Sequence, residues 1–297
     1  MFAAGEHLYW MILGGTFGGE RVSVPAQIIQ MDLDGSNKKV VYSLNNGEFL
    51  GNTAFAYDGS NFYFWVSAIT AEKNLLVSVS AKTGKSNVLA EFGGDTQCQL
   101  LGTSEDKLIL RILAPKSPEP YVLVSISIKD GAQKELIRWK EGERTFAVCQ
   151  GDCYSFSPSD GMLYKLSMPA GEETACFKAP IPLENGEQYR LLTDTYDGHL
   201  FFLQQNTNDL FVVECDTGAA RKIVLQKDGF NASIVAETKD SFLVFPEYKI
   251  FTFAGTAVDG TPEEQQLILP QYALMSKNNY WNSVPEYAYI SYENFMV

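Results

Sequence analysis

The amino-acid sequence predicts an all-β fold, a six-bladed β-propeller made of four-stranded antiparallel blades. The first observation is a turn ending in glycine that occurs six times, with 40 to 49 residues between successive glycines. The second is that short strands rich in aromatic and β-branched residues surround each turn in the same order. A period in the forties with four strands per repeat is typical of a propeller. The six glycines are Gly35, Gly84, Gly131, Gly171, Gly218 and Gly260.

Each repeat contains four predicted strands, named A to D in chain order. Strand B is the clearest, because an aromatic or β-branched segment follows a polar turn in every repeat, as sheet packing prefers. The B strands begin at His7, Asn61, Lys107, Asp152, His199 and Ser241. Strand A is expected at residues 53–57, 99–103, 146–150, 191–195 and 233–238. Strand C is expected at 28–32, 75–79, 121–128, 163–166, 210–214 and 250–253, and strand D at 39–42, 88–92, 135–139, 174–178, 222–225 and 266–269.

The first repeat has no predicted strand A, because the chain reaches strand B at His7. Residues 272–276 follow the sixth strand D and have the pattern of a strand A. We therefore expect this C-terminal strand to join the N-terminal blade, which would close the ring and remove an exposed sheet edge. Residues 277–297 include six Tyr, Trp or Phe residues and have no predicted place.

The composition indicates a folded domain with a strongly acidic surface. With 45% hydrophobic residues, a closed all-β architecture is expected to use residues 1–297 as one domain. The net charge of −13 excludes nucleic acid and anionic membranes as preferred partners. No apolar run approaches the roughly 20 residues that a membrane helix needs. Residues 8–13 follow no basic segment and are interpreted as a strand, so any export signal is expected outside this chain.

Histidine chemistry and metal binding are not expected. His7 and His199 both precede strand B, where the other repeats have Asn, Lys, Asp or Ser. A position that accepts any polar residue is a turn, so both histidines are expected to be exposed. Residues 32–37 place glycine at their fourth position, whereas an EF-type calcium loop requires it at the sixth. No metal and no cofactor are therefore predicted.

Five cysteines occur without a CxxC pair, at positions 98, 149, 153, 176 and 215. Cys149 and Cys153 lie on consecutive predicted strands across a turn, so they are able to approach each other. The alternative is that the cysteines are buried free thiols that pack as small hydrophobic residues. Both outcomes stay open from the sequence.

The first repeat resembles those of known propeller families. Residues 28–41, preceded by Leu8-Tyr9-Trp10, are similar to the repeat of YWTD-type six-bladed propellers, in which an aromatic strand precedes an Asp-Gly hairpin. The segment from Met31 to Asn37 resembles the Met-Asp-x-Asp-Gly-Ser-Asn hairpin of bacterial six-bladed propellers of unknown function, which have YWTD-like or TolB-like repeats. This resemblance implies the fold, strand A as the innermost strand, and a location outside the cell or on the surface of a bacterium.

The predicted loops differ at the two ends of the strands. The A-to-B and C-to-D turns are short and share one face, whereas the B-to-C and D-to-A connections are long and share the other. Binding residues concentrate on variable loops held by a rigid scaffold, so the long-loop face is the candidate recognition face. If strand A is innermost, its first residues surround the channel mouth on that face. These candidates are Asn52, Gln97, Gln99, Arg144, Tyr189, Arg190, Asn231 and Gln271.

Polar residues with two arginines at this mouth suit an anionic or sugar-like ligand, although polar residues also line channels without binding anything. We expect a non-enzymatic binding or scaffold propeller with a protein or glycan ligand. The alternative is a carbohydrate-active or lactone-hydrolysing enzyme with its site at the same mouth. Two carboxylates about 5 to 10 Å apart would favour the enzyme, and arginines and amides without such a pair would favour binding. Neither the ligand nor the oligomeric state follows from the sequence.

Overall fold

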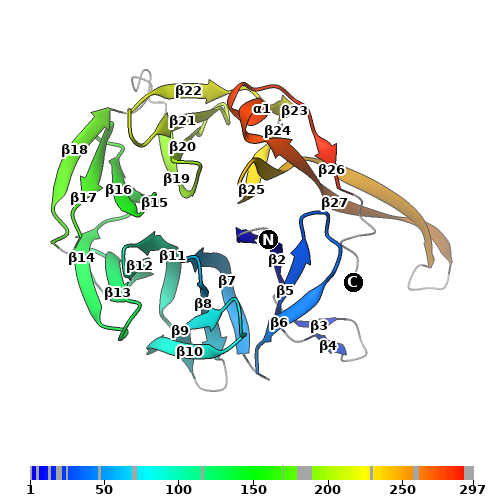
Figure 1. The fold of residues 1–297 in the computed structure, drawn as a ribbon, viewed down its shortest axis with the longest axis horizontal. Helices are drawn as coiled ribbons and strands as arrows, with labels where there is room; N and C mark the ends of the chain where they lie inside the picture. The colour runs from blue at the N-terminus through cyan, green and yellow to red at the C-terminus, as the bar shows by residue number, and fades with distance from the viewer. Residues whose placement is uncertain are drawn as a thin grey trace. The chain divides into compact units, whose positions relative to one another are not determined.

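The structure, a computed structural model, confirms the predicted fold class. Six four-stranded antiparallel sheets form the blades of a six-bladed β-propeller (Figure 1). Within the described residues, no helix is long and apolar enough to cross a lipid bilayer. The structure describes residues 2–4, 7–12, 15–17, 22–24, 26–45, 48–68, 72–114, 117–168, 170–178, 189–227, 230–256 and 261–290.

The blades follow one another along the chain, and in each blade the four strands lie side by side in chain order. The first contains β1 (Phe2–Ala4), β2 (His7–Ile12), β5 (Gln27–Asp32) and β6 (Lys39–Ser43). The second contains β7 (Glu48–Tyr57), β8 (Asn61–Ala68), β9 (Lys73–Ser80) and β10 (Ser86–Gly93). The third contains β11 (Gln97–Ser104), β12 (Lys107–Leu113), β13 (Tyr121–Ser127) and β14 (Gln133–Trp139).

The fourth blade contains β15 (Thr145–Cys149), β16 (Asp152–Ser157), β17 (Met162–Leu166) and β18 (Glu173–Lys178). The fifth contains β19 (Tyr189–Tyr196), β20 (His199–Gln204), β21 (Leu210–Glu214) and β22 (Ala220–Ile223). The sixth contains β25 (Ser233–Glu237), β26 (Ser241–Thr256), β27 (Pro262–Ser276) and β28 (Ala288–Tyr289), with α1 (Lys277–Trp281) before the last strand. Two small hairpins lie between these elements, β3 (Gly15–Phe17) with β4 (Val22–Val24), and β23 (Gln226–Lys227) with β24 (Phe230–Asn231).

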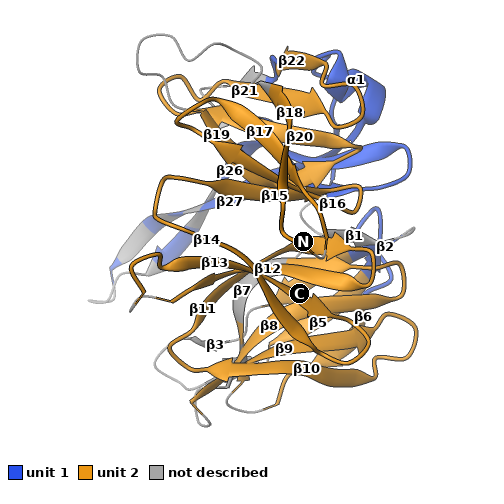
Figure 2. Cartoon of the chain, turned by 90° about the vertical axis from the view of Figure 1, so that its left-hand side faces the viewer, with its two compact units in different colours: residues 1–8, 31–38, 223–297 blue, residues 9–30, 39–222 orange. Residues whose placement is uncertain are grey.

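Two compact units are distinguished by their internal contacts (Figure 2). One comprises residues 1–8, 31–38 and 223–297, and the other comprises residues 9–30 and 39–222. The second unit contains nearly all of the second to fifth blades, and the candidate site described below lies within it. The expectation that residues 1–297 form one domain stays a prediction.

The N-terminal blade has its own strand A, contrary to the sequence prediction. β1 lies beside β2 in that sheet, so residues 272–276 are not needed there. They form the end of β27 and pair with β26, as Ala273 does with Val244. The prediction that a C-terminal strand joins the N-terminal blade is therefore wrong. The last strand, β28, pairs Tyr289 with Ala273 and completes the sixth blade instead.

This error arises from the unusual length of the hairpin formed by β26 and β27. Residues 250–253 and 266–269, predicted as strands C and D, are the outer part of this hairpin, where Ile250 pairs with Ile268. Strand C of the sixth blade is the inner part of β27, and strand D comes from residues beyond α1. The sixth predicted turn, at Gly260, lies outside the described residues.

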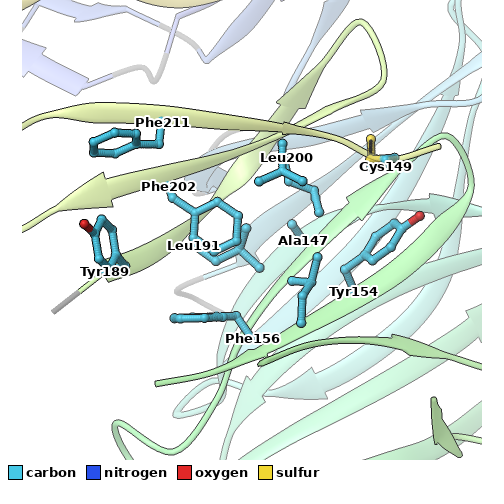
Figure 3. Close-up of a cluster of buried hydrophobic side chains, with 12 residues drawn as sticks. Ala147, Cys149, Tyr154, Phe156, Tyr189, Leu191, Leu200, Phe202 and Phe211 are labelled. Atoms are coloured by element: carbon cyan, nitrogen blue, oxygen red, sulfur yellow. Dashed lines mark hydrogen bonds between the residues drawn. The ribbon is translucent and has the colours of Figure 1, made fainter. Parts of the chain in front are cut away.

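Hydrophobic cores lie between neighbouring blades from the second to the fifth, where strand B is buried on both faces. Almost every residue of β16 and β20 is buried. A strand covered on both faces needs apolar residues at consecutive positions rather than at alternate ones, which explains the continuous aromatic pattern of the B strands. Figure 3 shows the core between the fourth and fifth blades, where the rings of Phe156 and Phe202 meet edge to face with centroids 5.2 Å apart.

The repeated glycine turns have a packing role that the sequence analysis did not predict. Gly84, Gly131 and Gly171 have positive φ angles of 69°, 71° and 77°, which glycine adopts readily. Strand D of the preceding blade also approaches each of them, so an added Cβ would lie 2.7 Å or less from a backbone carbonyl oxygen. These oxygens belong to Val41, Leu89 and Leu136. The turn of one blade therefore rests against the outer strand of the blade before it, and a side chain does not fit there.

The carboxylate of Asp58 organises the A-to-B turn of the second blade. Its Oδ1 atom accepts hydrogen bonds from the backbone N–H groups of Ser60 and Asn61, both at 2.8 Å. Its Oδ2 atom accepts one from the hydroxyl of the buried Tyr63. Desolvation raises the pKa of the Asp58 carboxyl, but these hydrogen bonds to the ionised form outweigh it and hold the pKa below its ordinary value.

We expect Asp58→Asn to destabilise the chain by about 1 kcal/mol near neutral pH, because the variant loses charge-assisted hydrogen bonds. The folded-state pKa of Asp58 is depressed, so its stabilisation is present above the unfolded-state pKa and is lost as the pH falls through the folded-state value. The difference in Tm between wild type and variant should therefore shrink in acidic buffers. Glu172→Gln, at an exposed side chain, is the control. A difference in Tm that stays constant with pH would contradict this prediction.

Candidate functional site

A pocket of about 510 Å³ lies at the ends of strands in the third, fourth and fifth blades. Its lining includes four of the eight residues predicted from the sequence, Gln99, Arg144, Tyr189 and Arg190. Tyr189 is the first residue of β19 and Gln99 is the third residue of β11, so both lie near the beginning of a strand A, as predicted. This is the end of the blades where strand A begins and strand B ends. The pocket therefore lies on the predicted long-loop face.

The other four predicted residues are not brought to this pocket. Gln97 is exposed at the start of β11, and Asn52 lies in β7 with a side chain outside the described part of the chain. Asn231 ends β24 and belongs to the other compact unit, as does Gln271. Gln271 is 8% exposed, and its Nε2 atom donates to the backbone oxygen of Ile290 at 3.0 Å. Gln271 was predicted at the channel mouth because residues 272–276 were wrongly expected to close the ring. Its side chain instead holds the backbone of Ile290.

Arg111 lines the pocket and was missed by the sequence analysis. It lies near the end of β12, directly opposite Gln99 in the pairing of β11 with β12. The first residues of strand A face the last residues of strand B in an antiparallel pair. The last residues of each predicted strand B therefore belonged among the candidates, and this rule would have identified Arg111. The pocket with Arg111, Arg144 and Arg190 in its lining is called the arginine pocket below.

The three arginines differ in how their charges are balanced. The guanidinium of Arg144 pairs with Glu173 at 3.2 Å and lies 5.1 Å from the centre of the Tyr164 ring. Arg111 lies over the Tyr121 ring at 5.7 Å. Neither Arg111 nor Arg190 forms an ion pair with a carboxylate among the described residues. Within the described part of the chain, two of the three positive charges in the pocket therefore have no carboxylate partner.

Arg111 and Arg190 are close enough for their charges to interact. Burial away from water is the main cause that lowers the pKa of Arg111, and the positive charge of Arg190 lowers it further, while Tyr121 opposes both. Like charges in a partly desolvated pocket repel each other, and a bound anion would relieve that repulsion. This arrangement stands out in a chain whose net charge is −13.

Two neutral polar groups of the pocket lack hydrogen-bond partners within the described structure. These are the Oε1 atom of Gln99 and the Oγ1 atom of Thr145, and both atoms are buried. The amide nitrogen of Gln99 is held by Thr193, with 3.3 Å between Nε2 and Oγ1. A buried polar atom without a partner costs free energy, so these two atoms are suited to hydrogen-bond with a ligand or water.

Carboxylates contribute little to the lining of the arginine pocket. Glu141 is the one carboxylate among its described lining residues. Glu173 is engaged by Arg144 and by the hydroxyl of Ser155, which donates to its Oε1 atom. Among the described residues, no group of three or more His, Cys, Asp or Glu side chains is arranged to hold a metal ion. The described lining residues therefore include no pair of carboxylates for acid and base catalysis.

The expectation that both histidines are exposed is wrong for His199. This side chain is 5% exposed, with its Nδ1 atom 2.6 Å from the backbone oxygen of Asp197. Its Nε2 atom lies 3.1 Å from the guanidinium of Arg221. The turns before the B strands are polar, but in the fifth blade His199 is the first residue of β20 and is buried. His199 and Arg221 do not line the arginine pocket.

Comparisons with known proteins address the fold. No protein-family model and no curated protein sequence matches the chain. TolB from Acinetobacter baumannii superposes with a TM-score of 0.55 at 11% identity, over 95% of this chain and 62% of the TolB chain. Oligogalacturonate lyase in complex with manganese gives 0.48 at 14% identity, over 91% of this chain and 79% of that one. An oligogalacturonate lyase from Vibrio parahaemolyticus gives 0.47 at 14% identity, with coverages of 88% and 74%.

At these identities, structural similarity informs the fold and not the ligand. The TolB match supports the TolB-like part of the predicted resemblance at the level of fold. No family or sequence match supports the YWTD-type part. This chain is therefore a six-bladed β-propeller similar in fold to TolB, and the similarity covers 62% of the TolB chain.

Proposed function

We propose that this chain is a non-enzymatic binding propeller that recognises a carboxylate-bearing carbohydrate in the arginine pocket. The observation that carries the proposal is that Arg111 and Arg190 line the same pocket, while neither forms an ion pair with a carboxylate among the described residues. Guanidinium groups bind carboxylates through two parallel hydrogen bonds, which gives both affinity and geometric selectivity.

The remaining lining favours a carbohydrate over an acidic peptide. Gln99, Thr145 and Thr193 supply amide and hydroxyl groups, which suit the several hydroxyls of a sugar. Tyr121, which is partly exposed, adds aromatic surface at the same pocket. The volume of about 510 Å³ lies within the range of small-ligand sites. Recognition of one or two sugar units with a single carboxylate fits these dimensions and groups.

The enzymatic alternative is less well supported. Glycoside hydrolysis commonly uses two carboxyl groups on either side of the scissile bond. Glu141 is the one carboxylate among the described lining residues, and Glu173, which is not among them, is paired with Arg144. A carbohydrate-active or lactone-hydrolysing activity at this pocket would therefore need groups other than such a pair.

The cellular location of the protein is also a proposal. From the resemblance of its first repeat to YWTD-like bacterial propellers, we infer that the protein acts outside the cell or at the surface of a bacterium. A carbohydrate with carboxylate groups is a ligand available in that setting. A protein partner that presents such groups is the alternative ligand.

We expect an oligosaccharide of uronic acids to bind the chain, and a neutral oligosaccharide of equal length to bind at least about tenfold more weakly. Arg111→Gln and Arg190→Gln should each weaken binding of the acidic sugar by about tenfold or more. Isothermal titration calorimetry measures both effects. Arg138→Gln is the matched control, because Arg138 is held by Glu135 on β14 and does not line the pocket.

Several outcomes would revise the proposal. Equal binding by wild type and both pocket variants would exclude the arginine pocket. Binding of glutamate-rich peptides in preference to the acidic sugar would identify a protein ligand. New reducing ends or unsaturated products after incubation with the sugar would establish an enzyme instead of a binding protein.

A further inference from the structure

Cys149 and Cys215 bring two buried thiols together from neighbouring blades. Their Sγ atoms lie 2.7 Å apart, and the residues are 1% and 6% exposed. Cys149 is the last residue of β15 in the fourth blade, and Cys215 follows β21 in the fifth. Figure 3 shows Cys149 at the edge of the core that these two blades share. Both residues belong to the larger compact unit.

The sequence analysis considered a different pair, Cys149 with Cys153. Cys149 pairs with Asp152, and Cys153 pairs with Val148, across the hairpin of β15 and β16. Adjacent pairs in a sheet point to opposite faces. Cys149 therefore belongs to the core shared with the fifth blade, while Cys153 belongs to the core shared with the third.

We propose that Cys149 and Cys215 are the site of an oxidative cross-link, a disulfide that joins the fourth and fifth blades. The separation of 2.7 Å is close to the bond length of about 2.05 Å, so little movement is needed to form the bond. The site lies at the short-turn ends of the strands and is independent of the arginine pocket. Its oxidant is a small-molecule disulfide such as glutathione disulfide.

The reaction is thiol–disulfide exchange in two steps. The Cys215 thiolate attacks one sulfur of glutathione disulfide, which forms a mixed disulfide and releases one glutathione thiolate. Cys149 then loses its proton and attacks the Cys215 sulfur, which forms the protein disulfide and releases the second glutathione. The two protein thiols lose two electrons and two protons in total, and one glutathione disulfide becomes two glutathione molecules.

The surroundings favour Cys215 as the attacking group. Its pKa is lowered by the hydrogen bond with Cys149 and, to a smaller extent, by one with Tyr154, although burial opposes both. The same contact with Cys215, together with burial, raises the pKa of Cys149. Because both residues are buried once folding is complete, the cross-link should form in a late stage of assembly, in which Cys149 and Cys215 are already in contact and the oxidant can still reach them.

The test is to refold the full chain in a glutathione redox buffer and, in parallel, in excess dithiothreitol. After alkylation of remaining thiols, peptide mapping by mass spectrometry should find Cys149 joined to Cys215 only in the first sample. The loop closed by this bond is long, so the oxidised protein should have a Tm higher by about 5 °C or more. Cys215→Ser should abolish both results, and Cys176→Ser, at a partly exposed thiol on β18, should leave them unchanged.

The peptide map of the wild type decides the question even if Cys215→Ser does not fold. Complete alkylation of both Cys149 and Cys215 after oxidative refolding would overturn the proposal. A disulfide between any other two cysteines, or a Tm that does not respond to dithiothreitol, would also overturn it.

Discussion

Gly131→Ala is expected to destabilise the chain by about 2 to 5 kcal/mol. Two costs add up at this position. A residue with a side chain is strained at a φ of +71°, by about 1 to 2 kcal/mol. The new Cβ would also collide with the carbonyl oxygen of Leu89, which belongs to the backbone of β10 and cannot rotate away as a side chain would. Separation of the second and third blades would add a cost of about 1 to 3 kcal/mol, typical of overpacking.

Gly151→Ala is the matched control for this prediction. Gly151 has a φ of +82°, but an added Cβ would meet nothing within 4 Å. This variant should therefore show only the strain of about 1 to 2 kcal/mol. Urea unfolding followed by circular dichroism measures both variants. Equal losses of stability would show that Leu89 does not constrain the turn, and that the glycine is needed only for its backbone conformation.

Phe202→Ala is expected to cost about 3 to 5 kcal/mol, the range for removing a fully buried aromatic side chain. The ring is 0% exposed and meets the equally buried Phe156 edge to face, so its removal leaves a cavity between the fourth and fifth blades (Figure 3). Part of the cost is the lost interaction between the two rings, about 0.5 to 1.5 kcal/mol.

Two comparisons make the measurement specific. Phe202→Leu keeps most of the apolar volume and should cost less than half as much. Tyr248→Ala removes an aromatic ring of similar size that is 48% exposed, and it should change the midpoint of urea unfolding far less. A small effect of Phe202→Ala, similar to that of Tyr248→Ala, would mean that the two blades do not depend on this core.

The sequence was most informative where structure depends on neighbouring residues. The glycine turns were predictable because a positive φ angle favours glycine, whatever the rest of the fold does. The B strands were predictable because burial on both faces requires consecutive apolar residues. Gln99, Arg144, Tyr189 and Arg190 were placed at one pocket because their positions repeat with the blades.

The sixth blade was not predictable in the same way. Residues 247–256 pair with residues 262–271 in one long hairpin, whereas the sequence pattern also suited two short strands around a glycine turn. Whether these residues form one long hairpin or two short strands depends on backbone hydrogen bonds between residues far apart in the chain. The conformational preferences of neighbouring residues do not decide it. Gln271 was misplaced for this reason, and its hydrogen bond to Ile290 shows the contact that determined its position.

By itself, the sequence determined the repeat, the four strands of the second to fifth blades and the end of the blades at which the arginine pocket lies. Only the tertiary structure decided which residues meet across strands and between blades. Arg111 joined the pocket through the register of β11 with β12, Gly131 gained a neighbour from another blade, and Cys149 faced Cys215 instead of Cys153. The physical reason is that turn chemistry and burial periodicity act over a few residues, whereas cross-strand register and packing between blades join residues far apart in the chain.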